Sequence, residues 1–157
     1  MGKSVIVDTN ALLLPGEFGV DIFAELGRLG YVHALIPRAV LTELERLSVS
    51  AGATGRERRA AALGRSLLEQ VIRSTDQTHA SFGLQVSIAA PAEGGEGSST
   101  GAGGAEEAGD TDALIVALAV RQKAAVLTND EELRKTLARA GIVTVYLRGG
   151  TRLEERE

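Results

Sequence analysis

The sequence has no cysteine and only two histidines among its 157 residues. Without cysteine, the chain can form neither a disulfide framework nor a thiolate metal site. His33 and His79 remain as the only imidazole ligands for a transition metal. A metal bound by this protein must therefore be held by oxygen, which favours Mg²⁺ or Mn²⁺ over zinc.

Long apolar runs and an excess of positive charge are also missing. No apolar segment approaches the roughly 20 residues that a membrane span needs, and no basic stretch followed by an apolar run opens the chain. We therefore expect a cytoplasmic protein without membrane contact. The net charge of −4 argues against coating nucleic acid by bulk electrostatics, and three Phe with two Tyr offer little base stacking. A local basic face remains compatible with both observations.

The chain does contain enough apolar material, 44% of its residues, to bury one core. Its length is that of an ordinary domain, so we expect a single domain over residues 1–157. Residues 93–109 are rich in Gly, Ser, Ala and Glu and offer almost nothing to bury. We expect this stretch to be a flexible loop within the domain.

Short β-branched runs alternate with helical patterns along the chain. The runs at 4–7, 124–128 and 142–147 predict buried parallel strands, and 32–36 and 84–88 are weaker strand candidates. Helical spacing is found at 19–29, 37–47, 56–73, 111–123 and 130–140. In the third helix, Leu63, Leu67 and Val71 form the expected apolar stripe. This alternation predicts a three-layer α/β/α fold around a parallel sheet.

Two acidic residues follow predicted strands directly. Asp8 comes after the first strand and Asp130 after the strand at 124–128. Ligand sites of open parallel sheets lie outside the carboxyl ends of the strands, so both carboxylates should converge there. An unpaired charge at the rim of the core is costly, and a bound cation would offset that cost. The alternatives are that Asp8 caps a turn and that Asp130 caps the helix that follows it.

Two further acids lie on inward faces of predicted helices. Glu43 falls on the stripe of Val40 and Leu47, where a carboxylate needs a partner. An ion pair with an arginine is the alternative. Asp112 shares a face with Ile115, although an acid in a first helical turn can also serve the helix dipole. We expect Asp110 to be the N-cap, which leaves Asp112 for another task.

At this point the residues resemble the PIN-domain nucleases. The similarity covers most of the chain, from the strand end at 7–10 and the helix at 37–44 to the helix at 112–119 and the strand end at 127–130. Residues 128–133 together with 141–148 look like archaeal members related to the ribosomal-RNA processing branch, and they are also similar to VapC-type toxins. One departure is Thr111, since many relatives have a second acid adjacent to Asp112.

The resemblance implies that four acids bind the metal and carry the catalysis, with three polar residues supporting them. The acids are Asp8, Glu43, Asp112 and Asp130, and the supporting residues are Asn10, Thr128 and Asn129. The departure at Thr111 leaves open whether Asp110 or Asp112 reaches the metal, and we favour Asp112.

The expected activity is hydrolysis of RNA phosphodiester bonds by an endoribonuclease that uses Mg²⁺ or Mn²⁺, in ribosomal-RNA or other RNA processing. Arginines are the candidate contacts to the RNA backbone: Arg38, Arg56, Arg59 and Arg65. The alternative for the arginine-rich helix is an ordinary solvated face. The resemblance also suggests a homodimer.

Three other functions compete with RNA processing. One is a toxin ribonuclease with an antitoxin partner, and another is a non-catalytic RNA-binding module that meets a ribosome-assembly partner. The last is a phosphatase of another doubly wound fold. That reaction would want a second Asp two residues after Asp8, where this sequence has Asn10.

Overall fold

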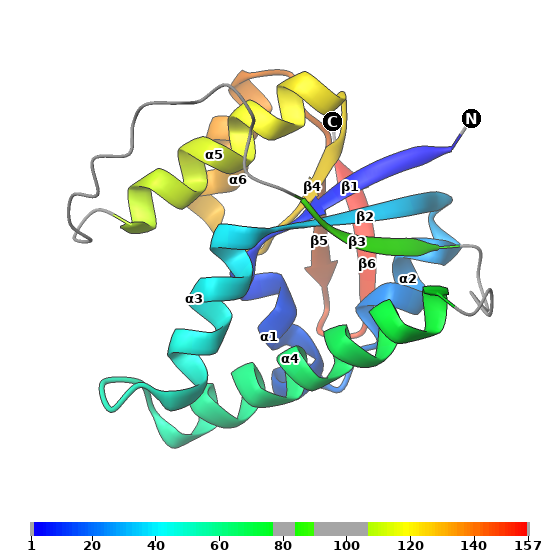
Figure 1. The fold of residues 1–157 in the computed structure, drawn as a ribbon. Helices are drawn as coiled ribbons and strands as arrows, with labels where there is room; N and C mark the ends of the chain where they lie inside the picture. The colour runs from blue at the N-terminus through cyan, green and yellow to red at the C-terminus, as the bar shows by residue number, and fades with distance from the viewer. Residues whose placement is uncertain (1, 77–83, 90–106, 157) are drawn as a thin grey trace.

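Short β-branched runs form the middle of a six-stranded sheet in the computed structural model, which describes residues 2–76, 84–89 and 107–156 (Figure 1). The strands are β1 (Lys3–Val7), β2 (Tyr31–Pro37), β3 (Gln85–Ala89), β4 (Ala125–Leu127), β5 (Thr144–Arg148) and β6 (Arg152–Arg156). The helices are α1 (Thr9–Phe18), α2 (Ile22–Arg28), α3 (Arg38–Val49), α4 (Gly55–Asp76), α5 (Glu107–Gln122) and α6 (Glu131–Arg139).

The strand order explains where a site can form. The sheet runs β3-β2-β1-β4-β5-β6, with parallel pairs throughout except for antiparallel β6. From β1 the chain moves outward through β2 and β3, then returns to β4 on the other side of β1. Such a reversal of direction opens a crevice at the carboxyl ends of the two central strands. The switch point of this sheet lies between β1 and β4.

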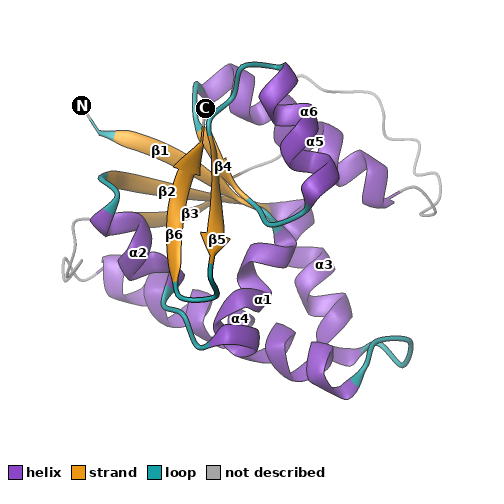
Figure 2. Ribbon diagram, turned by 180° about the vertical axis from the view of Figure 1, so that it is seen from behind, coloured by secondary structure: helices purple, strands orange, loops and turns teal. Residues whose placement is uncertain are grey.

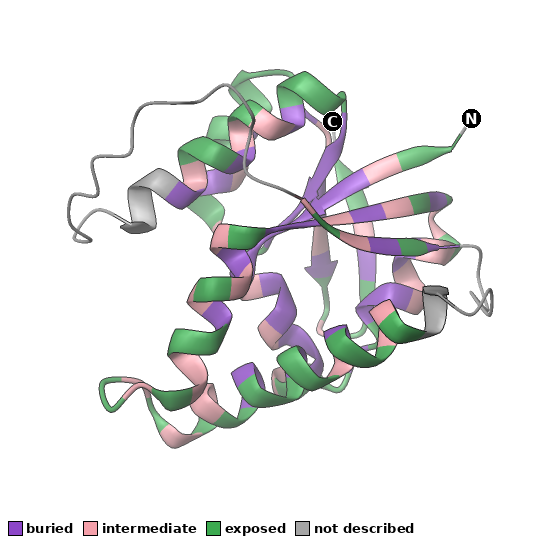
Figure 3. Cartoon of the chain, in the orientation of Figure 1, coloured by how far each residue is buried: buried purple, intermediate pink, exposed green. Residues whose placement is uncertain are grey.

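Helices cover both faces of the sheet, as the sequence predicts. Helices α1 to α4 lie on one face, and α5 with α6 on the other (Figures 1 and 2). This division follows from right-handed crossovers. The chain passes along the sheet in one direction before β3 and in the opposite direction after it, so the connecting helices change from one face to the other. The central strands are buried on both faces: Val5, Ile6, Val7, Val126 and Leu127 have no exposed surface (Figure 3). The three-layer α/β/α fold is therefore confirmed.

The buried stripe of α4 differs from the predicted one. Leu63 is exposed, whereas Ala61 and Leu68 are buried around Gly64. A Cβ on Gly64 would lie 2.1 Å from the carbonyl oxygen of Leu12, so α1 packs directly onto the α4 backbone at that point. Hydrophobic periodicity favours the largest apolar side chains, but the close approach of two helices requires the smallest.

Helix α1 and strand β6 are absent from the sequence predictions, and the predicted helix at 19–29 begins later. Gly19 has φ 70 and ends α1 in the left-handed conformation, and Asp21 then caps α2.

Helix α5 begins at Glu107 instead of 111, so residues 107–109 are helical and the rest of the predicted loop at 93–109 lies outside the described residues. The prediction of Asp110 as N-cap is therefore wrong. Its side chain is not among the described ones.

Among the described helices, none combines the length and the apolar character that a membrane-spanning segment needs.

Candidate active site

A cleft of about 260 Å³ lies at the carboxyl ends of β1 and β4, at the switch point of the sheet. All four acids proposed from the sequence line it, and each comes from a different segment of the chain. The lining residues are Asp8, Thr9, Asn10, Leu13, Glu43, Leu47, Thr111, Asp112 and Asp130. The structure therefore brings the predicted acids together, and apolar Leu13 and Leu47 form part of the wall.

Asp8 is fixed in position by three hydrogen bonds. It follows β1, is only 5% exposed and is the N-cap of α1. Its Oδ1 accepts from the Thr9 amide at 2.8 Å, while Oδ2 accepts from Asn10 Nδ2 at 2.9 Å and from the Thr128 hydroxyl at 2.8 Å. A carboxylate has about four acceptor positions, so roughly one remains for a ligand in the cleft. Asp8 therefore does cap a local element, although this element is a helix and not the turn of the alternative, and its carboxylate keeps an acceptor position for a ligand.

The polar residues Asn10, Thr128 and Asn129 connect the ends of three strands. The Asn129 amide donates to Asn10 Oδ1 at 2.9 Å, and the Leu147 amide donates to Asn129 Oδ1 at 2.7 Å. Thr128 accepts from the Asp130 amide at 3.0 Å while it donates to Asp8. The three side chains therefore tie β1, β4 and β5 together directly behind the acids.

Two acids of the cleft, Asp8 and Asp112, have raised pKa values. Burial is the main cause that raises the pKa of Asp8 from 3.8 to about 6, although hydrogen bonds from Thr128 and Thr9 oppose the shift. The charges of Asp112 and Glu43 raise it further. The pKa of Asp112 is raised as well, first by burial and then by the charges of Asp130 and Glu43. The hydrogen bonds and charges of the cleft therefore do not fully stabilise the ionised forms of Asp8 and Asp112.

The helical acids face the cleft as their spacing predicts. Glu43 lies on α3 between buried Val40 and the cleft residue Leu47. None of the ion pairs between described residues involves Glu43, so the arginine alternative has no support there. Asp112 lies beyond the first turn of α5, where the helix dipole has little effect on a carboxylate. The dipole explanation is therefore weaker for Asp112.

Asp130 both caps a helix and lines the cleft. Its Oδ1 accepts from the Leu133 amide at 3.0 Å, which makes Asp130 the N-cap of α6, in agreement with the capping alternative. The same residue lines the cleft. One carboxylate oxygen thus holds the helix, and the cap fixes the direction of the other.

The donor set of the cleft fits a hard divalent cation. Its ionisable side chains are all carboxylates, which Mg²⁺ and Mn²⁺ prefer. The Thr9 hydroxyl also lies buried at the cleft without a hydrogen-bond partner, as expected where a water or ion completes a site. Within the described residues, however, no three His, Cys, Asp or Glu side chains are close enough together to hold an ion as they stand. Ion binding would therefore require side-chain rotation toward the centre of the cleft.

Two polar residues of the cleft were not predicted from the sequence, and the four arginines that were predicted as RNA contacts do not line the cleft. Thr9 and Thr111 are buried in its lining, and their only sequence signal is that each adjoins a candidate acid. None of the cleft-lining residues is an arginine. The predicted RNA contacts on α4 are at least partly exposed, and Arg65 there pairs with Glu69 at 3.6 Å. Their proposed role stays a prediction.

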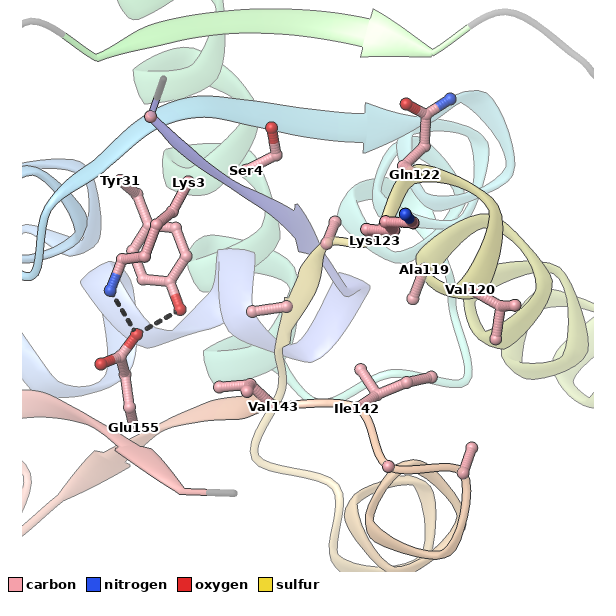
Figure 4. Close-up of a pocket in the computed structure, with 15 residues that line it drawn as sticks. Lys3, Ser4, Tyr31, Ala119, Val120, Gln122, Lys123, Ile142, Val143 and Glu155 are labelled. Atoms are coloured by element: carbon pink, nitrogen blue, oxygen red, sulfur yellow. Dashed lines mark hydrogen bonds and ion pairs between the residues drawn. The ribbon is translucent and has the colours of Figure 1, made fainter.

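A larger cavity, about 980 Å³, lies at the opposite end of the sheet (Figure 4). It is lined by the amino ends of β1 and β4 and by the last turn of α5. Its acid, Glu155, accepts from Lys3 Nζ at 2.8 Å and from the Tyr31 hydroxyl. These hydrogen bonds outweigh burial and lower the pKa of Glu155. The carboxylate here is already neutralised, so this cavity has no unpaired acid to offer a cation.

Comparisons with known proteins agree with this fold. A family model described as "PIN like domain" matches residues 5–95 and 88–150. Two solved structures share the fold at low sequence identity. A domain of a functionally unknown protein from Methanocaldococcus jannaschii DSM 2661 is 22% identical with a TM-score of 0.58, covering 99% of this chain and 95% of that one. The PIN domain endonuclease Utp24 is 19% identical with a TM-score of 0.59, covering 98% and 90%.

No curated protein is significantly similar to the chain. The family match nevertheless covers most of it and includes β1, α3, α5 and β4, the segments that end at or carry the four acids. The chain belongs to the PIN-like domain family.

Proposed function

We propose that this protein is a metal-dependent endoribonuclease that hydrolyses RNA phosphodiester bonds. The observation that carries the proposal is the convergence of four carboxylates on one cleft at the switch point of the sheet. The structural neighbour Utp24 is described as a PIN domain endonuclease, which supports the same class of reaction.

The residues that would hold the ion are Asp8, Glu43, Asp112 and Asp130. A bound Mg²⁺ or Mn²⁺ would supply a Lewis acid for the phosphate and would lower the pKa of a bound water. A cation is needed in this cleft because the acids repel a phosphate as well as one another.

The chain's own contribution is to hold two of these carboxylates, those of Asp8 and Asp130, in fixed directions. Thr128 donates to Asp8 and accepts from the backbone of Asp130, so one hydroxyl positions two acids at once. Asn10 donates to the same oxygen of Asp8 as Thr128 does. Acids that hydrogen bonds already hold, such as Asp8 and Asp130, lose less conformational entropy on binding than free side chains do. The side-chain rotation that an ion requires therefore falls to Glu43 and Asp112.

The test incubates the purified protein with a labelled single-stranded RNA in Mn²⁺, in Mg²⁺ and in EDTA, beside the variant Asp8→Asn. We expect cleavage in either metal, none in EDTA, and none from the variant. Asp21→Asn is the matched control, since Asp21 also caps a helix through its side chain but is exposed and lies outside the cleft. The control should cleave like the wild type.

Two results would contradict the proposal. Cleavage that persists in EDTA or in Asp8→Asn would mean that a contaminating or different activity acts on the RNA. Binding of RNA without cleavage in either metal would point to a non-catalytic RNA-binding module.

A further inference from the structure

A second hollow, of about 360 Å³, extends along α6 from the residue that follows Asp130, and it has the opposite charge to the acidic cleft. Its lining comes from α6 and from the paired strands β5 and β6. The lining residues are Glu131, Arg134, Lys135, Ala138, Thr144 and Arg156. Three cations therefore face one acid, and we call this surface the basic hollow. Asp130 in the cleft and Glu131 in the basic hollow are consecutive residues, so the two sites share the start of α6.

We infer that the basic hollow binds the phosphodiester backbone of the RNA that enters the acidic cleft. This inference rests on the proposed nuclease function, because it assigns a second subsite for the same substrate. An acidic active site repels the backbone on both sides of the bond that is cut, so affinity for RNA must come from cations nearby. The basic hollow offers such cations on a surface that begins at the same end of α6 as the cleft.

Arg134 is held ready for such a contact. Its guanidinium lies over the ring of Tyr146 on β5, with 4.3 Å between the guanidinium carbon and the ring centroid. Its backbone amide donates to the Asp130 carbonyl at 2.9 Å, which ties the first turn of α6 to the cleft. A stacked guanidinium loses less entropy on binding phosphate than a mobile one. None of the ion pairs between described residues includes Arg134.

The positive charge continues along the strands. In the β5–β6 pairing, Thr144 faces Arg156, Tyr146 faces Glu154 and Arg148 faces Arg152. Residues directly opposite in an antiparallel pair have side chains on the same face of the sheet, so these arginines lie on one face with Tyr146. Two arginines placed opposite each other are destabilising unless an anion lies between them. Glu154 pairs with Arg148 at 3.0 Å, and the charge of Arg152 acts on Glu25 of α2, so each arginine of this pair has an acid near it.

The basic hollow competes with α4, whose Arg56 and Arg59 are the contacts that the sequence suggests. Neither of those arginines lines the cleft or the basic hollow. The two candidate surfaces therefore make different predictions for matched pairs of variants.

The test measures binding of labelled single-stranded RNA by fluorescence anisotropy in EDTA, over a series of salt concentrations. The double variant Arg134→Gln with Arg156→Gln is compared with Arg56→Gln with Arg59→Gln, because both remove two positive charges. We expect the first pair to lower affinity and to make the slope of log affinity against log salt shallower by about 1.4, at roughly 0.7 for each phosphate that is no longer neutralised. The α4 pair should leave the slope unchanged.

An equal effect in both pairs, or an effect in the α4 pair alone, would overturn the inference. If circular dichroism shows that the double variant is unfolded, Lys135→Gln provides the same comparison, with an expected change in slope of about 0.7. A single-stranded DNA of the same sequence should show the same slopes, since the shared backbone is recognised.

Cleavage in Mn²⁺ separates this inference from the proposed function. If the wild type binds RNA as described but does not cleave it, the proposed nuclease activity is wrong, whereas RNA binding by the basic hollow is supported. A wild type that cleaves, beside an Arg134→Gln, Arg156→Gln variant that binds and cleaves equally well, overturns the basic hollow alone.

Discussion

Both ends of the sheet have a cavity with acidic side chains, but the charge of these side chains is neutralised at one end only. At the amino end, Glu155 is hydrogen-bonded by Lys3 and Tyr31, and the pKa of the carboxyl is lowered. At the carboxyl end, the pKa values of Asp8 and Asp112 are raised by burial and by neighbouring acids. The amino-end cavity is the larger of the two. Unneutralised charge therefore identifies the candidate site better than volume does.

The largest expected effect comes from removing a charge at the carboxyl end. Asp112→Asn should lower the rate of RNA cleavage by more than about 100-fold, because even the partners of metal ligands contribute about 10–100-fold. The rate is measured in Mn²⁺ under single-turnover conditions. An activity within a few-fold of wild type would remove Asp112 from the site and return attention to Asp110.

The next effect tests the hydroxyl that positions two acids. Thr128→Val keeps the shape of the side chain but removes the donor to Asp8 and the acceptor for the Asp130 amide. We expect cleavage to fall by about 10–100-fold, and Thr128→Ser to restore most of it. Circular dichroism checks the fold of both. A serine variant as inactive as the valine variant would mean that the methyl group, rather than the hydrogen bonds, matters.

The third effect is on stability: whereas most substitutions lower the free energy of unfolding, Asp8→Asn should raise it. In metal-free protein the raised pKa of Asp8, about 6 against 3.8, corresponds to up to about 3 kcal/mol of destabilisation when the group is ionised at neutral pH. An Asn side chain can keep its oxygen toward Asn10 and Thr128 but then loses the hydrogen bond from the Thr9 amide, at a cost of about 1 kcal/mol. Asp8→Asn should thus stabilise the protein in EDTA by about 1–2 kcal/mol. The measurement is the melting temperature, which rises by roughly 2–4 °C for each kcal/mol.

The pH dependence of that difference follows from the same pKa. Between about pH 4 and 6 the folded state keeps the Asp8 proton while the unfolded chain loses it, so wild-type stability relative to the variant rises as the pH falls. The advantage of Asp8→Asn should therefore shrink from pH 7 to pH 4, and saturating Mn²⁺ should reverse it at pH 7. A wild type that is more stable in EDTA at pH 7 would contradict this account of the cleft.

The smallest effect belongs to the amino end. Glu155→Gln removes the charge that Lys3 pairs with, at a side chain that is one third exposed. We expect a loss of about 0.5–1 kcal/mol in unfolding free energy and no change in cleavage. Denaturant unfolding and the RNA assay measure the two quantities. A large drop in cleavage would show that the two ends of the sheet are coupled.

The sequence was informative where hydrophobic pattern and topology act together. The apolar run at 4–7 and the polar residues after it predict both β1 and the position of Asp8, because parallel strands end at a common edge. The helical spacing around Glu43 likewise predicts the face that meets the cleft. These features depend on short-range periodicity, which a single sequence records.

Other features depend on what lies opposite each residue in space. Helix α1 was missed because three consecutive leucines followed by Pro15 and Gly16 hide its period. Strand β6 was missed because Leu153 is its only buried residue among those described, as suits a charged edge strand. The basic hollow could not be predicted, since its cations are assembled from α6 and β6 by the pairing of β5 with β6.

The switch in strand order has a consequence for how the protein could be used. Asp8 and Glu43 belong to the chain before β3 ends at Ala89, whereas Asp112 and Asp130 belong to the chain after α5 begins at Glu107. A protein cut in two between these points would yield fragments that each hold half of the acids. If cleavage returned when the two fragments were mixed, its rate would measure how many fragment pairs had associated. The cleft could then serve as a reporter of the association of two polypeptides.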